Sequence, residues 1–242
     1  MIEDYDRLQF RRSWLFAGGF TLLLWLVRTV EWGTSTSFGS LGIFPRHASG
    51  MVGILTAPLV HGDFVHLLSN TFPMLLLLAA VFFIYPKIAL QVFAAIYLIT
   101  GFWVWIAARE AYHIGASGLV YGLAAFLFFS GIFRRDARSM AVALAIAFLY
   151  SGMLQGLLPG ADTSVSWESH LLGAAAGVFC SFYYRRSESD AVPKRIEPER
   201  DEAVSRTFAS YEFSASDNQT LYSFRSNEDD HLPMHYQYRK KE

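Results

Sequence analysis

A serine, two histidines and an asparagine in apolar segments are the side chains of this sequence that could do chemistry. Ser117 opens an apolar run that ends near Phe133, His66 and Asn70 lie near the start of an earlier run, and His170 starts a later one. Such polar groups are costly within membrane-length segments, so a set of them predicts a functional site. An imidazole could accept the seryl proton during attack on a carbonyl and return it to the leaving amine. The chemistry indicated is that of an activated nucleophile.

The apolar runs predict an all-α polytopic membrane protein. The chain has 242 residues, of which 53% are hydrophobic, and its polar residues concentrate near the two ends. Runs of about 18 to 22 residues carry few ionisable side chains, and this is the length an α-helix needs to cross the hydrocarbon core. We expect six spans, at residues 14–30, 64–85, 88–108, 115–133, 140–158 and 167–184.

The same pattern predicts three parts. A cytoplasmic N-terminus covers residues 1–12, a six-helix membrane domain covers 13–186, and a tail covers 187–242. The tail is rich in charged residues and has few aliphatic ones, so we expect it to be disordered and cytoplasmic. The loop from about residue 33 to 62 is long and of mixed polarity, which indicates a structured external segment lying on the membrane.

Basic residues mark one side of these spans. One side has Arg7, Arg11, Arg12, Lys87, Arg134, Arg135, Arg138, Arg185 and Arg186, and the other has Arg28, Arg46 and Arg109. The positive-inside rule therefore places both termini in the cytoplasm. The second, fourth and sixth spans then run inward from the outer surface, so Ser117, His66 and His170 share one layer just below it. The N-terminus has no organelle-type address, which favours a bacterial plasma membrane.

Small residues indicate how these helices approach one another. Gly118 and Gly122 form a ridge on the fourth span, and Gly173 and Gly177 form one on the sixth. Such ridges let two helices come to backbone contact. If the ridges face each other, the Ser117 hydroxyl and an imidazole can meet within hydrogen-bond reach.

The residues around Ser117 also suggest how an oxyanion would be stabilised. The N–H of Ser117, at a helix N-terminus, is one donor, and the side chains of His66 and Asn70 are two more. Glu168 stands two residues from His170 and points to another face of its helix, so the pattern indicates a dyad. Asp63 more simply caps the start of the second span.

Other classes find little support. Three histidines, including His61, invite a zinc site, but the sequence has no His-Glu-x-x-His motif, so we expect no metal and no cofactor. The single cysteine, Cys180, allows no disulfide within the chain. Basic residues form no stripe outside the membrane flanks, which excludes nucleic acid as a partner. The lipid bilayer and other membrane proteins remain the expected partners.

Three motifs in this order resemble the rhomboid family of intramembrane serine proteases, in its six-helix basic form. They are His61-x4-His66-x3-Asn70, Gly115-Ala116-Ser117-Gly118 followed by Tyr121, and His170-x2-Gly173-x3-Gly177. The resemblance covers residues 13–186. A Trp-Arg pair that many rhomboids carry after the first span is absent here.

The resemblance implies a role for each matching residue. Ser117 corresponds to the nucleophile, His170 to the general base, and His66 with Asn70 to the oxyanion-stabilising residues. Tyr121 corresponds to the aromatic residue that stacks on the catalytic imidazole. His61, Gly115, Gly118, Gly173 and Gly177 would have supporting roles, and the fifth span would be the lateral gate.

The expected function is therefore hydrolysis of peptide bonds in or near transmembrane segments of membrane-protein substrates. A non-catalytic relative that binds or escorts membrane proteins is the alternative, although such relatives typically lose the serine or the histidine. A transporter would call for discontinuous helices and an inverted repeat, and the sequence has neither.

Overall fold

The computed structural model describes residues 2–135, 137–159, 166–187, 210–214, 220–225 and 237–240. The chain divides into two units, Met1–Ala191 and Val192–Glu242.

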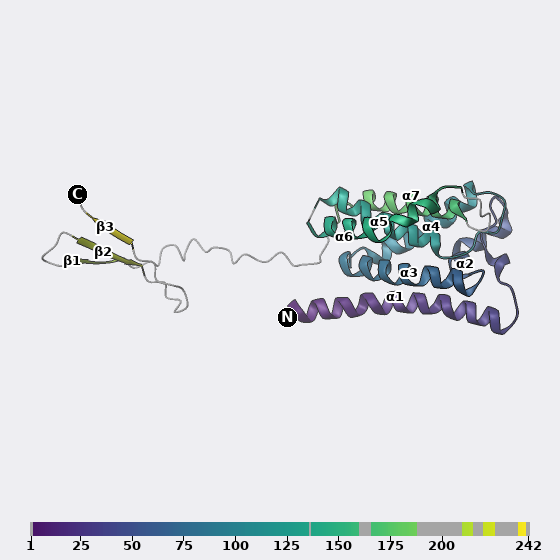
Figure 1. Cartoon of the computed structure of the whole chain (residues 1–242), viewed down its shortest axis with the longest axis horizontal. Helices are drawn as coiled ribbons and strands as arrows, with labels where there is room; N and C mark the ends of the chain where they lie inside the picture. Colours follow the sequence, from purple (N-terminus) through teal and green to yellow (C-terminus); the bar gives the residue numbers. More distant parts are fainter. Residues whose placement is uncertain are drawn as a thin grey trace. The chain divides into compact units, whose positions relative to one another are not determined.

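Long helices dominate the described part of the first unit (Figure 1). They are α1 (Ile2–Gly33), α3 (Phe64–Ile84), α4 (Ala89–Ala107), α5 (Ser117–Arg134), α6 (Ala137–Leu149) and α7 (Trp167–Tyr183). Four of them are long and apolar enough to cross a membrane, namely α1 from Asp4 onward, α3, α4 and α5. The described helices thus have the character of a polytopic membrane protein. The helices α6 and α7 are shorter, with 13 and 17 residues.

The fifth expected span differs from the structure. We expected one helix over residues 140–158, but α6 ends at Leu149 and the chain continues as a 3-10 helix, η4 (Ser151–Leu157). Serine and two glycines, Gly152 and Gly156, occur within this short stretch. Glycine has little preference for the α-helix, and serine competes for backbone hydrogen bonds, so the change of helix type has a local cause.

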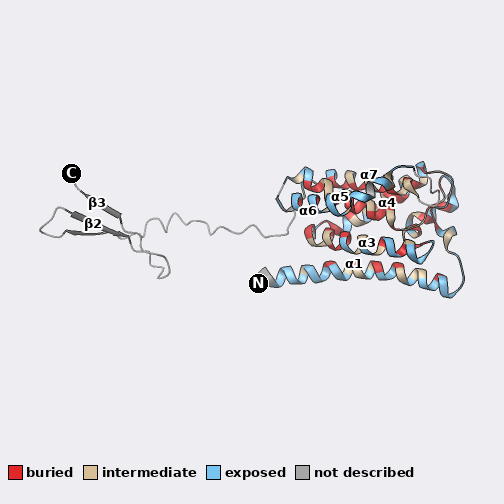
Figure 2. Cartoon of the chain, viewed as in Figure 1, coloured by how far each residue is buried: buried red, intermediate tan, exposed pale blue. Residues whose placement is uncertain are grey.

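The helix α5 lies at the centre of the first unit. It packs against α3, α4, α6 and α7, whereas α1 packs mainly on α3. Burial follows this arrangement: 56% of the most apolar window of α5 is buried, against 22% of that of α1. Figure 2 shows the contrast between the exposed length of α1 and the buried central helices. Ser117 is therefore the first residue of the most buried of these four helices.

The segment between α1 and α3 contains four short helical elements. These are η1 (Gly39–Leu41), η2 (Ala48–Val52), α2 (Gly53–Thr56) and η3 (Ala57–Leu59). They are fastened to the segment that leads from α4 into α5. Ile43 forms an antiparallel bridge with His113, the Arg46 guanidinium donates to the carbonyl of Ala108 at 2.7 Å, and Gly115 N–H donates to the carbonyl of Ala57 at 2.9 Å.

The second unit contains a three-stranded antiparallel sheet in the order β1-β2-β3. The strands are β1 (Ser210–Ser214), β2 (Thr220–Arg225) and β3 (Gln237–Lys240). The register pairs Tyr211 with Phe224 and Tyr222 with Tyr238. The composition of residues 187–242 did not lead us to expect strands, although aromatic residues favour them. The rest of that tail lies outside the described residues, so its expected disorder stays a prediction.

Candidate active site

The glycine ridges of α5 and α7 lie against each other. A side-chain carbon added at Gly173 would collide with the carbonyl oxygen of Gly118, and one added at Gly177 would collide with that of Gly122. These are backbone atoms, which cannot rotate away as a flexible side chain can. The two helices are therefore in direct backbone contact at the level of Ser117 and His170, as small-residue ridges allow.

This contact brings Ser117 and His170 together. Ser117 is the first residue of α5 and His170 lies in the first turn of α7. The distance from Ser117 Oγ to His170 Nε2 is 2.8 Å, which is a good hydrogen bond. The imidazole is buried, with 8% of the residue exposed, whereas Ser117 is half-buried.

The other ring nitrogen of His170 fixes its tautomer. Nδ1 lies 2.9 Å from the carbonyl oxygen of Gly156, in η4. A carbonyl oxygen can only accept, so Nδ1 carries the hydrogen in a neutral ring and Nε2 is left with its lone pair toward Ser117. The Tyr121 ring stacks on the imidazole, with centroids 4.2 Å apart and planes 8° from parallel. The arrangement suits an imidazole that takes the seryl proton.

His66 lies close to the segment that precedes Ser117. A side-chain carbon added at Gly115 would come within 2.7 Å of His66 Cε1 and 2.9 Å of its Nε2. Gly115 has φ +102°, a conformation that favours glycine. Two features therefore require glycine at position 115: its positive φ angle and the close approach of the His66 imidazole.

The start of α3 orients His66 and Asn70. Asp63 is the N-cap, and its carboxylate accepts the His66 N–H at 2.7 Å, which lowers the pKa of Asp63. One turn on, Asn70 Nδ2 donates to the His66 carbonyl at 3.1 Å and the residue is 4% exposed. An amide nitrogen has a second hydrogen, so this bond leaves Asn70 one further donor.

His61 contacts the backbone beside Ser117 rather than the cavity. Its Nε2 accepts the Ala116 N–H at 3.3 Å, and the residue is fully buried. Burial, together with the nearby His66, lowers the pKa of His61 to about 4. The ring is therefore neutral near pH 7, as an acceptor must be. His61 thus supports the backbone of Ala116, the residue before Ser117.

The sequence did not point to a polar network at the start of α7. His113 Nε2 lies 2.9 Å from the Arg109 carbonyl, so it donates there, and Nδ1 accepts from the Ser166 hydroxyl at 2.6 Å. Ser166 in turn accepts from the hydroxyl of Ser169 at 2.7 Å. Burial is the main cause that lowers the pKa of His113, which favours the neutral ring that this network requires.

Glu168 is engaged away from the dyad. It is 7% exposed, and its Oε1 lies 3.4 Å from Arg109 Nη1. The ion pair ties α7 to the segment between α4 and α5. No sequence pattern predicts the contacts of His113 and Glu168, because these contacts depend on how distant segments of the chain cross.

A cavity of about 760 Å³ opens beside the dyad. This is the size of a typical ligand pocket. Its wall includes Ser117, His170, Tyr121, His66 and Asn70, together with Asp63, Ser69, Arg109 and His113. The structure thus brings the five principal candidate residues to one cavity. His61 and the ridge glycines are not among its lining residues.

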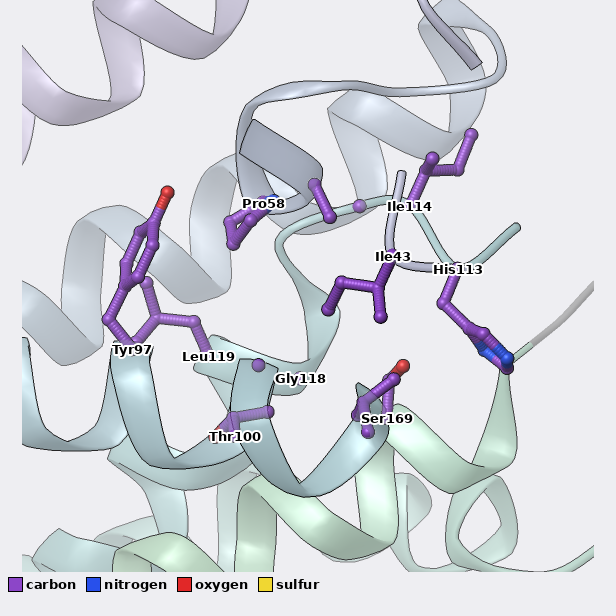
Figure 3. Close-up of a pocket in the computed structure, with 13 residues that line it drawn as sticks. Ile43, Pro58, Tyr97, Thr100, His113, Ile114, Gly118, Leu119 and Ser169 are labelled. Carbon is purple, nitrogen blue, oxygen red and sulfur yellow. The ribbon is translucent and has the colours of Figure 1, made fainter. Parts of the chain in front are cut away.

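A second, much smaller cavity is lined by residues of α4 and by the starts of α5 and α7 (Figure 3). Its volume is about 30 Å³, and Thr100, Gly118 and Ser169 are among its lining residues. It can hold no more than a molecule the size of water, so it is not a peptide site. Among the described residues, no group of three histidine, cysteine, aspartate or glutamate side chains is placed to hold a metal ion.

Comparison with known proteins assigns the chain to a family. The sequence model of the Rhomboid domain matches residues 48–187, more than half of the chain. The chain belongs to the rhomboid family. The match covers α3 to α7 and hence every residue of the site, and members of this family are generally intramembrane serine proteases.

The rhomboid has relatives in mycobacteria. The protein "Uncharacterized protein Rv1337" of Mycobacterium tuberculosis (strain ATCC 25618 / H37Rv) is 33% identical over 197 residues, which cover 75% of this chain and 80% of that protein. "Uncharacterized protein ML1171" of Mycobacterium leprae (strain TN) is 31% identical over 184 residues, which cover 71% and 73%. No solved structure matches this chain significantly. The rhomboid is thus an integral membrane protein with bacterial relatives.

Proposed function

We propose that this rhomboid is an intramembrane serine protease that uses a Ser117–His170 dyad. The hydrogen bond of 2.8 Å between Ser117 Oγ and His170 Nε2 carries this proposal. Family membership alone would also fit a non-catalytic relative. The tautomer enforced by the Gly156 carbonyl adds support, because it leaves Nε2 able to accept the seryl proton.

Peptide hydrolysis then proceeds in two steps. Ser117 Oγ attacks the scissile carbonyl carbon while His170 Nε2 takes the hydroxyl proton. The tetrahedral intermediate collapses as the C–N bond breaks, and His170 gives its proton to the leaving amine. Water, activated by the same imidazole, cleaves the acyl-enzyme and regenerates the serine.

The developing oxyanion would be stabilised by donors on two elements. The Ser117 N–H is in the first turn of α5, where backbone N–H groups have no partner within the helix and the helix dipole favours negative charge. His66 and Asn70 line the same cavity from α3. Their side-chain N–H groups would complete the oxyanion hole.

The proposal places the dyad in a six-span membrane domain with both termini in the cytoplasm. Ser117 and His170 lie at the starts of their helices, and basic residues cluster at the other ends of these helices, which supports this orientation. The substrates would then be membrane proteins cut in or near a transmembrane segment, close to the outer surface. No cofactor enters the chemistry.

Cleavage of a single-span substrate in liposomes tests the proposal. The wild-type protein should release a shorter fragment, and Ser117→Ala and His170→Ala should each release none. Ser69→Ala is the matched control, because Ser69 lines the same cavity but donates to the His66 carbonyl on its own helix. Cleavage by Ser117→Ala at the wild-type rate would refute the proposal. Binding without cleavage by the wild-type protein would favour the escort function.

A further inference from the structure

The segment after α6 contributes a backbone carbonyl, rather than a side chain, to the site. The 3-10 helix η4 crosses beside α7, and the Gly156 carbonyl lies 2.9 Å from His170 Nδ1. In Ser-His-Asp proteases, a carboxylate at this nitrogen holds the imidazole in the correct tautomer and orientation. Glu168, a carboxylate two residues from His170 in the sequence, is paired with Arg109 instead.

Gly156 is also restricted by what surrounds it. A side-chain carbon at this position would collide with the Tyr121 hydroxyl oxygen and would lie 3.1 Å from His170 Nδ1. Gly152, in the same 3-10 helix, has no atom within 4 Å of the corresponding position. The two glycines thus belong to the same 3-10 helix, but only Gly156 has neighbouring atoms where a side chain would begin.

We propose that Gly156 is a positioning residue, whose carbonyl oxygen orients His170 in place of a carboxylate and whose missing side chain leaves room for the Tyr121–His170 stack. The inference rests on the proposed function. The inference assigns to η4 a part in the chemistry. A neutral oxygen stabilises the imidazolium less than a carboxylate does, but it selects the tautomer equally well, because it accepts only from an Nδ1–H.

The tautomer can be measured without any assay of activity. In protein labelled with ¹⁵N-histidine, the His170 resonances are identified by their loss in His170→Asn. The wild-type spectrum near pH 8 should show a protonated Nδ1 and an unprotonated Nε2. A protonated Nε2 would overturn the inference even if the enzyme cleaves its substrate.

Substitution tests the second half of the inference. Gly156→Ala should lower kcat by about 10²-fold or more, the range for loss of general acid–base catalysis, with KM changed by less than about threefold. Gly152→Ala is the matched control and should keep kcat within about twofold of the wild type, because its added methyl group meets nothing.

A second substitution separates positioning from general damage to the fold. Tyr121→Phe removes the hydroxyl that the new methyl group would meet but keeps the ring. The double variant Gly156→Ala/Tyr121→Phe should therefore recover kcat at least about tenfold over Gly156→Ala, with Tyr121→Phe alone as reference. Equal cleavage rates in Gly156→Ala and Gly152→Ala would overturn the inference. An inactive wild-type protein would instead refute the proposed function. The NMR measurement of the His170 tautomer would still test the role of the Gly156 carbonyl.

Discussion

Replacing Gly173 with alanine should push α5 and α7 apart and so disable the dyad. The new methyl carbon would collide with the Gly118 carbonyl oxygen and lie 2.8 Å from the Gly118 carbonyl carbon, whereas ordinary contacts are 3.4–4 Å. Both atoms belong to the backbone, so the strain is relieved only by moving the helices. A separation of about 1 Å is needed to restore normal contact.

This movement acts directly on the proposed chemistry. Gly118 follows Ser117 in α5, and His170 precedes Gly173 by one turn of α7, so both partners move with their ridges. Adding about 1 Å to the hydrogen bond of 2.8 Å takes it beyond the limit of an effective bond. Misplacement of this size can cost about 10²-fold in rate. Overpacking should also lower the free energy of unfolding by about 1–3 kcal/mol.

Two measurements check this prediction, namely the initial rate of substrate cleavage and the thermal unfolding midpoint in detergent. Gly18→Ala is the matched control, because nothing lies within 4 Å of a side-chain carbon at Gly18 in α1. It should leave the cleavage rate unchanged and raise stability by up to about 1 kcal/mol, since alanine favours the helix. If Gly173→Ala cleaves as fast as Gly18→Ala, the close contact of α5 and α7 does not position the dyad.

Three further predictions concern residues at or near the starts of α3 and α7. His66→Ala and Asn70→Ala should each lower kcat by about 10²-fold, as loss of an oxyanion-hole donor does, while a pure structural role would change stability and leave kcat of the folded fraction intact. Because the pKa of His61 is lowered from 6.5 to about 4 in the folded state, the unfolded state binds the extra proton. The contribution of His61 to the free energy of unfolding is therefore complete above pH 6.5 and decreases by about 3 kcal/mol as the pH falls to 4. Chemical unfolding across this range should show a smaller fall in His61→Gln, and an equal fall would show that other groups are responsible. Glu168→Gln should lower stability by about 1 kcal/mol, since its partner Arg109 is partly exposed, and an unchanged urea midpoint would contradict this.

The sequence was sufficient to identify what depends on residue type and helical spacing. The glycine pairs at i and i+4 predicted that α5 and α7 could meet at their backbones, and the polar residues at the starts of three apolar runs predicted which side chains would gather. Both follow from helix periodicity, which is a local property. The capping role of Asp63 is local in the same sense, because an N-cap contacts its own first turn.

Features that depend on the path of the chain between helices could not be predicted. The partner of His170 Nδ1 is a backbone carbonyl, which every residue has, so no sequence pattern identifies Gly156 as the acceptor of this hydrogen bond. The change from α6 to η4 decides where that carbonyl lies. The sequence predicts a supporting role for His61 but does not indicate its partner, which in the structure is the Ala116 N–H. The interactions of His113 and Glu168 likewise arise from crossings of segments distant in sequence.

The reactivity of Ser117 tests the central proposal most directly. A fluorophosphonate probe reacts with a serine only when a base activates it, so intact-protein mass spectrometry of the labelled protein reports the Ser117–His170 pair itself. We expect one adduct per chain, located at Ser117 by peptide mapping, and none in His170→Ala, which retains the serine. No adduct on the folded wild-type protein, or equal labelling of His170→Ala, would contradict the proposal that the two residues form a catalytic dyad.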